Sequence, residues 1–334
     1  MIRHMKFTPL ILTLSLITAA VLPSLAEESK VSFTRTKLKG IGLENGVMRR
    51  DPSDIIKVGD LYYVWYSKGK ISSGYDATVW YATSSDGVEW TEKGQALAKG
   101  AAGTWECASV FTPNILVAEG KYYLFYTGTA RPYKKGGAKP AQKIGIANPD
   151  SKIGVAVSDS PDGPWVRNEA NPVITNSTVE SDFDSHLVDD SCLITRDGKY
   201  WLYYKGRQLG KSPRFTQMGL AVAENPEGPY IKSSANPVIP GNHEVVVYPY
   251  KSGVAAMIGK VGPVGLVHTI MYAEDGLRFS KLLSTEKGAW AGGFYRPEAF
   301  TDSNTGDHPS WGIEIIKGPL PGLGRYDMHI PTPN

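Results

Sequence analysis

The sequence predicts an all-β fold, a single five-bladed β-propeller of four-stranded antiparallel blades. Three observations predict it. Short runs rich in Val, Ile, Tyr and Trp alternate with Gly- and Pro-containing turns, no long amphipathic helical pattern interrupts them, and one strand–turn–strand unit recurs along the chain. The alternative, a β-sandwich, gives no reason for its strand pairs to share a register.

Residues 1–26 are expected to be a secretory signal peptide that lies outside the fold. Basic residues precede the apolar run LILTLSLITAAVL, and Ser24 and Ala26 give a small-x-small cleavage pattern. The apolar run is too short for a membrane anchor. We therefore expect residues 27–334 to form one exported domain, periplasmic or secreted, with no membrane partner.

Composition argues against nucleic acid as a partner. The formal net charge of +3 includes basic residues of the predicted signal peptide, and no basic block follows. The two cysteines, Cys107 and Cys192, do not have the spacing of a metal motif. An exported chain could join them in a disulfide, but we favour two free thiols.

The repeated unit begins with a hairpin. Its three clearest copies are DPSDIIKVGDLYYVWYSKG, FTPNILVAEGKYYLFYTG and DDSCLITRDGKYWLYYKG, and each reads as a strand, a Gly-containing turn and an aromatic strand. The step from the first residue to the first tyrosine of the second strand is 11 in all three copies: Asp51 to Tyr62, Phe111 to Tyr122 and Asp189 to Tyr200.

A second hairpin follows the first in each copy, so one unit contains four antiparallel strands, as in a propeller blade. TVWYATSSDGVEWTEKG and MGLAVAENPEGPYIKSSANPVI are examples. Units begin near residues 51, 111, 189, 243 and 296, which makes five blades. We expect the stretch 31–48 to supply the strand that closes the last blade, and the polar, basic insertion 131–152 to be a surface loop.

Acidic residues occupy the start of several innermost strands. These strands run along the central axis of a propeller, so the register brings Asp51, Asp189 and Glu244 to one mouth of the channel. Like charges in a low-dielectric cleft raise one another's pKa, and such an arrangement is typical of a functional site. Paired carboxylates suit glycoside hydrolysis in particular, because one protonates the leaving oxygen and the other activates water or attacks the sugar.

These residues also have structural explanations. Asp51 could be an Asp-Pro turn residue that caps a strand, and Arg296 could form an ion pair with Glu298. Asp190 is expected to face away from the mouth, because neighbours in a regular strand point to opposite faces.

Seven side chains are expected to contact a substrate. Aromatic rings offer stacking faces to sugars, and basic groups near the mouth could meet anionic groups of a glycan or form surface ion pairs. The set is Trp105, Thr112, His186, Lys205, Arg207, Arg296 and Glu298.

The order of the motifs resembles that of glycoside hydrolase family 117. RRDPSDIIKVGDLYYVWY, VFTPNILVAEGKYYLFYTG, VDDSCLI, the His-Glu pair ahead of VVVYP, and FYRPEAF carry the resemblance, which runs from about Gly46 to Phe300. It implies an exo-acting, inverting enzyme that cleaves the α-1,3-linked 3,6-anhydro-L-galactose from the non-reducing end of neoagaro-oligosaccharides. The expected partner is therefore an agar-type algal oligosaccharide.

The resemblance also assigns four catalytic residues. Asp51 matches the presumed general base, Asp189 the second aspartate that orients substrate or tunes neighbouring pKa values, Glu244 the third acidic residue, and His243 a histidine proposed as the acid. Ser191 stands where we expect a proline.

The resemblance bears on cofactors and assembly as well. No cofactor is required, although a divalent metal ion in the central channel is compatible with the family, with unknown ligands. A homodimer is compatible too, although the short segment before Asp51 looks extended and lacks the helical arm of dimeric members.

Three alternatives stay open. The acid is His243, whose unperturbed pKa near 6.5 leaves it partly protonated at neutral pH, or Glu244 with a pKa raised by its surroundings. A five-bladed glycosidase of the arabinanase or β-xylosidase type would use two Asp and a Glu without the histidine. A non-catalytic carbohydrate-binding propeller would keep the aromatic residues but has no need of converging acids.

Overall fold

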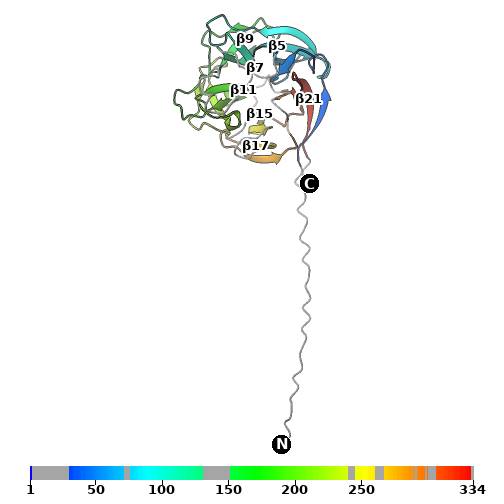
Figure 1. The fold of residues 1–334 in the computed structure, drawn as a ribbon, viewed down its shortest axis with the longest axis vertical. Coiled ribbons are helices and arrows are strands. Elements are labelled where there is room, and N and C mark those ends of the chain that lie inside the picture. Colours follow the sequence, from blue (N-terminus) through cyan, green and yellow to red (C-terminus); the bar gives the residue numbers. More distant parts are fainter. Residues whose placement is uncertain are drawn as a thin grey trace.

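Five β-sheets surround a common axis like the blades of a propeller (Figure 1), which confirms the predicted fold. Within the described residues, helical structure is limited to a 3-10 turn at Pro213–Phe215, and no helix could span a membrane. The predicted signal peptide and most of the predicted loop at 131–152 lie outside the described residues. The computed structural model describes residues 30–70, 76–130, 151–239, 245–259, 267–287, 292–297 and 306–331, together with Met1, Ala289 and Ala299.

The first three blades follow the predicted unit of two hairpins. Antiparallel ladders join their strands in chain order from the axis outward, and both β2 and β3 pair with β4 because the inner strand of blade one is interrupted. The strands are β2 (Met48–Arg50), β3 (Ile56–Val58), β4 (Leu61–Gly69), β5 (Ala77–Ser84) and β6 (Thr91–Leu97) in blade one; β7 (Ser109–Ala118), β8 (Lys121–Thr129), β9 (Ser151–Ser158) and β10 (Val166–Arg167) in blade two; and β11 (Leu187–Arg196), β12 (Lys199–Arg207), β13 (Gln217–Ala223) and β14 (Ile231–Lys232) in blade three.

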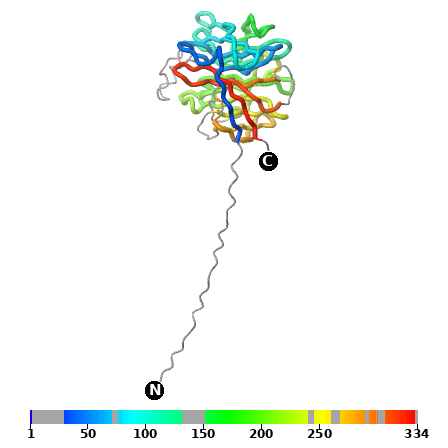
Figure 2. The backbone as a smooth tube through the Cα atoms, turned by 90° about the vertical axis from the view of Figure 1, so that its right-hand side faces the viewer, coloured from blue at the N-terminus to red at the C-terminus, as the bar shows by residue number. Residues whose placement is uncertain are grey.

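Blade five closes the ring with strands from both ends of the chain. Strand β1 pairs antiparallel with β21 along its whole length, as the adjacent blue and red tubes of Figure 2 show. The predicted closing strand within 31–48 is therefore confirmed. The remaining strands are β15 (Val245–Tyr250), β16 (Gly253–Ile258), β17 (Thr269–Ala273) and β18 (Ser280–Ser284) in blade four, and β19 (Gly293–Phe294), β20 (Trp311–Ile316), β21 (Gly322–His329) and β1 (Ser32–Lys37) in blade five.

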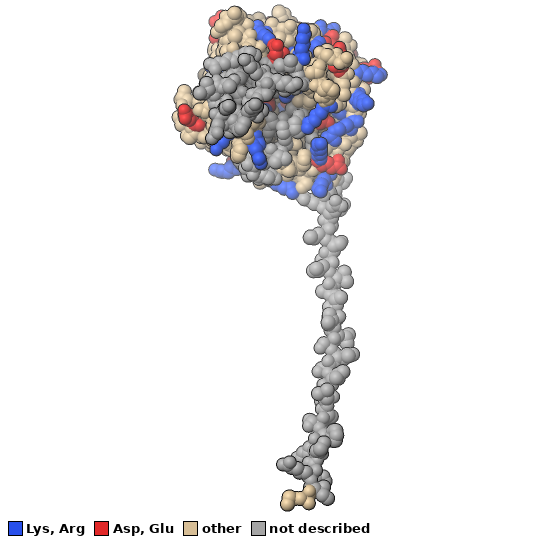
Figure 3. Space-filling model, viewed as in Figure 1, with Lys and Arg blue, Asp and Glu red and all other residues tan. Residues whose placement is uncertain are grey.

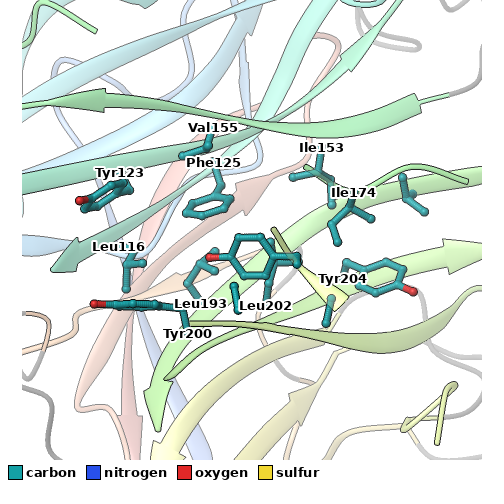
Figure 4. Packing of buried hydrophobic residues seen from close by; sticks show 14 of the residues in the cluster. Leu116, Tyr123, Phe125, Ile153, Val155, Ile174, Leu193, Tyr200, Leu202 and Tyr204 are labelled. Atoms are coloured by element: carbon teal, nitrogen blue, oxygen red, sulfur yellow. The ribbon is translucent and has the colours of Figure 1, made fainter. Parts of the chain in front are cut away.

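A hydrophobic cluster fills each of the five interfaces between neighbouring blades. Figure 4 shows the cluster between blades two and three, where Leu116 and Phe125 face Leu193 and Leu202. Inner strands pack on both faces, so β7 is buried at every position. This packing holds the inner strands, and the residues at their mouth ends, in fixed positions.

Charged side chains of both signs are interspersed on the face that Figure 3 shows.

Candidate active site

The inner strands of blades two and three break at the same point. The ladder of β7 with β8 skips from Phe111 to Asn114, and the ladder of β11 with β12 skips from Asp189 to Cys192. In each case two residues oppose one residue of the partner strand, which is a β-bulge. Such a bulge changes the direction in which side chains point. Here it lies near the mouth end of the innermost strand.

The inner strand of blade one is also interrupted, directly after Arg50. In all three blades the first residue of the break has a left-handed backbone, with φ of 50° at Asp51, 43° at Thr112 and 47° at Asp190. For residues other than glycine this conformation costs about 1–3 kcal/mol, and such strain clusters at functional sites. These three residues line one cavity at the axis. We call them the bulge tier.

Asp190, rather than Asp189, is therefore the structural counterpart of Asp51, and the predicted register is wrong by one residue at this point. In blade one the ladder stops at Arg50 and resumes at Ile56, so five residues oppose three of β4. This surplus of two is one residue more than the surplus in blades two and three. Counting 11 residues back from the first tyrosine of the second strand reaches the bulge residue Asp51 in blade one. In blades two and three the same count reaches the residue before the bulge residue.

A proline marks the correct alignment in two of the three copies. Pro52 follows Asp51 and Pro113 follows Thr112, and the residue before a proline is pushed out of the right-handed helical region. Ser191 takes the proline's place in blade three, which hides the equivalence of Asp190. The expectation that Asp190 faces away from the mouth fails because the strand is not regular there.

The cavity at the axis is enclosed by all five blades. Besides the bulge tier, Val245 of blade four and Gly293 of blade five line it. A second ring of side chains also lines it, three residues further along blade one and two further along blades two and three. These are Asp54, Asn114 and Cys192, which we call the linker tier.

Basic groups hold the carboxylates of the bulge tier. Arg50 Nε donates to Asp51 Oδ2 at 2.9 Å, and Lys205 Nζ donates to Asp190 Oδ2. Burial raises the pKa of Asp51, the positive charge of Arg50 opposes this, and the negative charge of Asp190 adds to it. Two carboxylates thus influence each other across one cavity while each keeps a cation.

Asp189 lies beside this tier but does not line the cavity. Its Oδ1 is 3.5 Å from Lys205 Nζ. Burial raises the pKa of Asp189 to about 7, with the charge of Lys205 opposing the rise and that of Asp190 adding to it. Its predicted catalytic role stays a prediction.

The linker tier joins blades to one another. Asn114 Oδ1 accepts the backbone N–H of Asp54 at 3.2 Å, and its Nδ2 donates to the carbonyl oxygen of Ser191 at 2.8 Å. Asp54 Oδ1 accepts the backbone N–H of Phe294 at 2.8 Å. These bonds connect blades one, two, three and five, and sequence reasoning missed Asp54 and Asn114 because they look like ordinary strand residues.

The structure corrects the predicted placement of Arg296. Arg296 Nη1 donates to Asp54 Oδ2 at 2.9 Å, and both side chains are buried. It lines a second cavity further along the axis rather than the one at the bulge tier. Arg296 thus forms an ion pair with an acid of blade one, and Glu298, its predicted alternative partner, lies outside the described residues.

The structure also corrects the placement of Trp105. Its ring stacks on Tyr126 with 5.9 Å between ring centroids, over Gly128 and Gly154, which lack a side chain that would block it. Trp105 therefore packs within blade two and does not line the axial cavity. Trp65 and Trp201 likewise pack in hydrophobic clusters between blades.

The other predicted residues divide into three groups. Thr112 lines the cavity, and its hydroxyl bonds Thr127 at 2.5 Å. His186, Lys205 and Arg207 are buried close to Asp189, and the His186 backbone N–H donates to the carbonyl oxygen of Arg207 at 3.0 Å. His243 and Glu244 lie outside the described residues.

Cys107 and Cys192 are free thiols, as favoured. Across the described ranges, no three His, Cys, Asp or Glu side chains group as a metal site requires. A metal ion in the channel therefore stays a prediction.

Comparisons with known proteins agree with this geometry. A family model for glycosyl hydrolases family 43 matches residues 43–191, which include Asp51, Thr112 and Asp190. The endo-arabinase of Bacteroides thetaiotaomicron (16% identity, TM-score 0.53, covering 89% of this chain and 98% of that one) and a GH43_1 enzyme of Xanthomonas citri (14%, 0.54, 85% and 89%) share the fold. No curated protein sequence matches the chain.

One solved structure is much more similar. Zg3597, a family 117 glycoside hydrolase produced by the marine bacterium Zobellia galactanivorans, is 31% identical, with a TM-score of 0.77 and 90% of each chain covered. That level of identity over nearly the whole length shows that the chain belongs to glycoside hydrolase family 117.

Proposed function

We propose that this propeller-type glycoside hydrolase is an exported, exo-acting and inverting enzyme that removes α-1,3-linked 3,6-anhydro-L-galactose from the non-reducing end of neoagaro-oligosaccharides. The observation that carries the proposal is the pair of carboxylates, Asp51 and Asp190, that the same backbone bulge directs into one axial cavity. Membership of family 117 supports the sugar, the linkage and the exo action.

Asp51 is proposed as the general base. It takes a proton from a water that attacks the anomeric carbon from the face opposite the leaving group. Its raised pKa favours this role, because a base works best with a pKa closer to the working pH. Arg50 at 2.9 Å fixes the orientation of the carboxylate.

Asp190 is proposed to orient the sugar and to tune Asp51. Its contact with Lys205 holds its carboxylate in place, and its negative charge raises the pKa of Asp51. This is the role that the resemblance gives to a second aspartate, and the geometry favours Asp190 over Asp189 for it. His243 or Glu244 is proposed as the acid that protonates the glycosidic oxygen.

The family 43 match favours one other candidate, an arabinanase- or β-xylosidase-type activity in the same cavity. It would use the same two aspartates with Glu244 as the acid, and His243 would then be dispensable. If His243 is the acid of the first proposal, His243→Gln should abolish turnover, whereas under the second candidate it should leave turnover nearly unchanged.

Incubation with neoagarobiose, neocarrabiose and aryl arabinosides and xylosides tests the two candidates directly. We expect release of 3,6-anhydro-L-galactose from neoagarobiose alone, with the inverted anomer as the first product in NMR spectra. Cleavage of only the aryl pentosides would favour the second candidate, and hydrolysis of none of these would contradict both. N-terminal sequencing of the exported protein tests the predicted removal of residues 1–26.

A further inference from the structure

Blades two and three carry the same polar anchor near their mouth ends. A buried acid just before the inner strand pairs with a cation on the outermost strand, with 2.8 Å between Glu106 Oε1 and Arg167 Nε in blade two and 2.5 Å between Asp184 Oδ2 and Lys232 Nζ in blade three. Each cation also donates to a backbone carbonyl oxygen of the segment leading to that acid. The two anchors are therefore equivalent by position and by bonding.

The aromatic layer beside the two anchors differs. In blade two the Trp105 ring lies nearly parallel to Tyr126, at an angle of 15°. In blade three the smaller Phe183 takes the place of Trp105 and is tilted by 37° against Tyr204. Replacement of an indole by a phenyl ring, and of Arg by Lys, removes volume from blade three. Figure 4 shows the Tyr204 hydroxyl pointing away from the hydrophobic cluster.

A groove of about 750 Å³ lies beside Phe183 and Lys232 in blade three. The strands of blade three are green in Figure 1. The groove is at the same end of the blade as the axial cavity, because Gln217 at its edge pairs with Gly206, the neighbour of Lys205. Its walls are mostly hydroxyl and amide side chains, with Phe183 as an apolar surface. Its lining residues include Asn176, Ser181, Phe183, Gln217 and Lys232.

The groove is suited to a neutral, hydroxyl-rich ligand. Its charged residues are Asp182, Asp184 and Lys232, and Lys232 is already paired with Asp184, so no lining cation is left for an anion. The side-chain nitrogen of Asn176 is buried and has no hydrogen-bond partner among the described residues. A buried donor without a partner is destabilising, and a ligand hydroxyl would supply the missing hydrogen bond.

We propose that this groove is a second, non-catalytic binding site for a neutral oligosaccharide. Sugar hydroxyls would bond the amides of Asn176 and Gln217, and the apolar face of one ring would pack on Phe183. The class of ligand rests on the groove alone, whereas the choice of an agar-type chain as the main probe rests on the proposed function.

Titration calorimetry with neoagarohexaose tests the proposal in an Asp51→Asn background, which prevents turnover. We expect two binding events per chain, and the further changes Asn176→Ala and Gln217→Ala together should weaken one of them at least tenfold. Ser181→Trp, which fills the groove from an exposed position without removing a core contact, should do the same. Ile231→Ala is the matched control, because Ile231 is 69% exposed on β14 and does not line the groove.

Cellohexaose and a sulfated neocarrahexaose complete the design, with thermal melting to show that each variant is folded. A sulfated chain should bind the groove at least tenfold more weakly than a neutral one. Groove variants that bind every neutral hexaose as tightly as the Ile231→Ala control would overturn the proposal. If the catalytic proposal alone is wrong, wild-type protein releases no anhydrogalactose, but groove variants still lose binding of a neutral hexaose.

Discussion

The bulge tier and the linker tier both begin with an aspartate of blade one, and the two aspartates meet different surroundings. Asp54 is saturated by protein, with a backbone N–H on one oxygen and a guanidinium on the other. Asp51 bonds one neighbouring arginine and faces a cavity shared with a second acid. Both aspartates line that cavity. The carboxylate whose two oxygens are bonded by protein groups holds blades together, while the one bonded by a single neighbouring arginine can act on a ligand.

The largest effect should come from loss of the Asp51 charge. Asp51→Asn removes the proposed base but keeps the shape of the side chain, so we expect kcat to fall by about 10²–10⁴-fold. The melting temperature should stay the same or rise, because a buried carboxylate with a raised pKa is lost. Steady-state kinetics on neoagarobiose and a thermal melt measure both, and a variant with normal kcat would remove Asp51 from the mechanism.

Asp54→Ala should have the opposite profile. It breaks the buried ion pair between Asp54 and Arg296, which costs about 3–5 kcal/mol of unfolding free energy. Urea unfolding measures this, and Asp54→Ala combined with Arg296→Met should recover part of the loss. If Asp54→Ala lost as much kcat as Asp51→Asn at the same folded fraction, the two tiers would not have separate structural and catalytic roles.

Asp189 should make the stability of the protein depend on pH. Its folded-state pKa of about 7 lies above the ordinary aspartate value of 3.8, so the folded protein binds more protons between these values. The stability from this group is complete below about pH 4 and is lost as the pH rises through about 7. We expect Asp189→Asn to remove this decline and to raise the melting temperature at pH 8 by about 2–5 °C. An unchanged difference from wild type between pH 5 and pH 8 would contradict it.

Thr112 should show the smallest effect. It has the bulge backbone but no charge, so Thr112→Val should leave kcat within about threefold and cost about 1 kcal/mol, the net value of its hydrogen bond to Thr127. Thr112→Ser, which keeps the hydroxyl, is the control. A large fall in kcat for the valine variant alone would give this hydroxyl a catalytic role.

The sequence was sufficient for the fold because the repeated hairpins fix the strand order and the closing strand. The site was harder to predict, since a repeat count assumes that every copy has the same length. Blade one has an extra residue inside its bulge, and this moved the prediction from Asp190 to Asp189. The blade-joining role of Asp54, and the packing of Trp105 over two glycines, depend on contacts between distant segments that no local pattern encodes.

The pairing of β1 with β21 makes the fold depend on the completeness of the chain. Ser32 faces His329 in that ladder, so the seam of the ring joins residues at opposite ends of the polypeptide. Pairing of such distant segments is slow, because the loop must close before the contact stabilises it. A nascent chain that has not yet reached Gly322 has four complete blades but no closed ring, and the fixed axial cavity follows only when the last strand has been made.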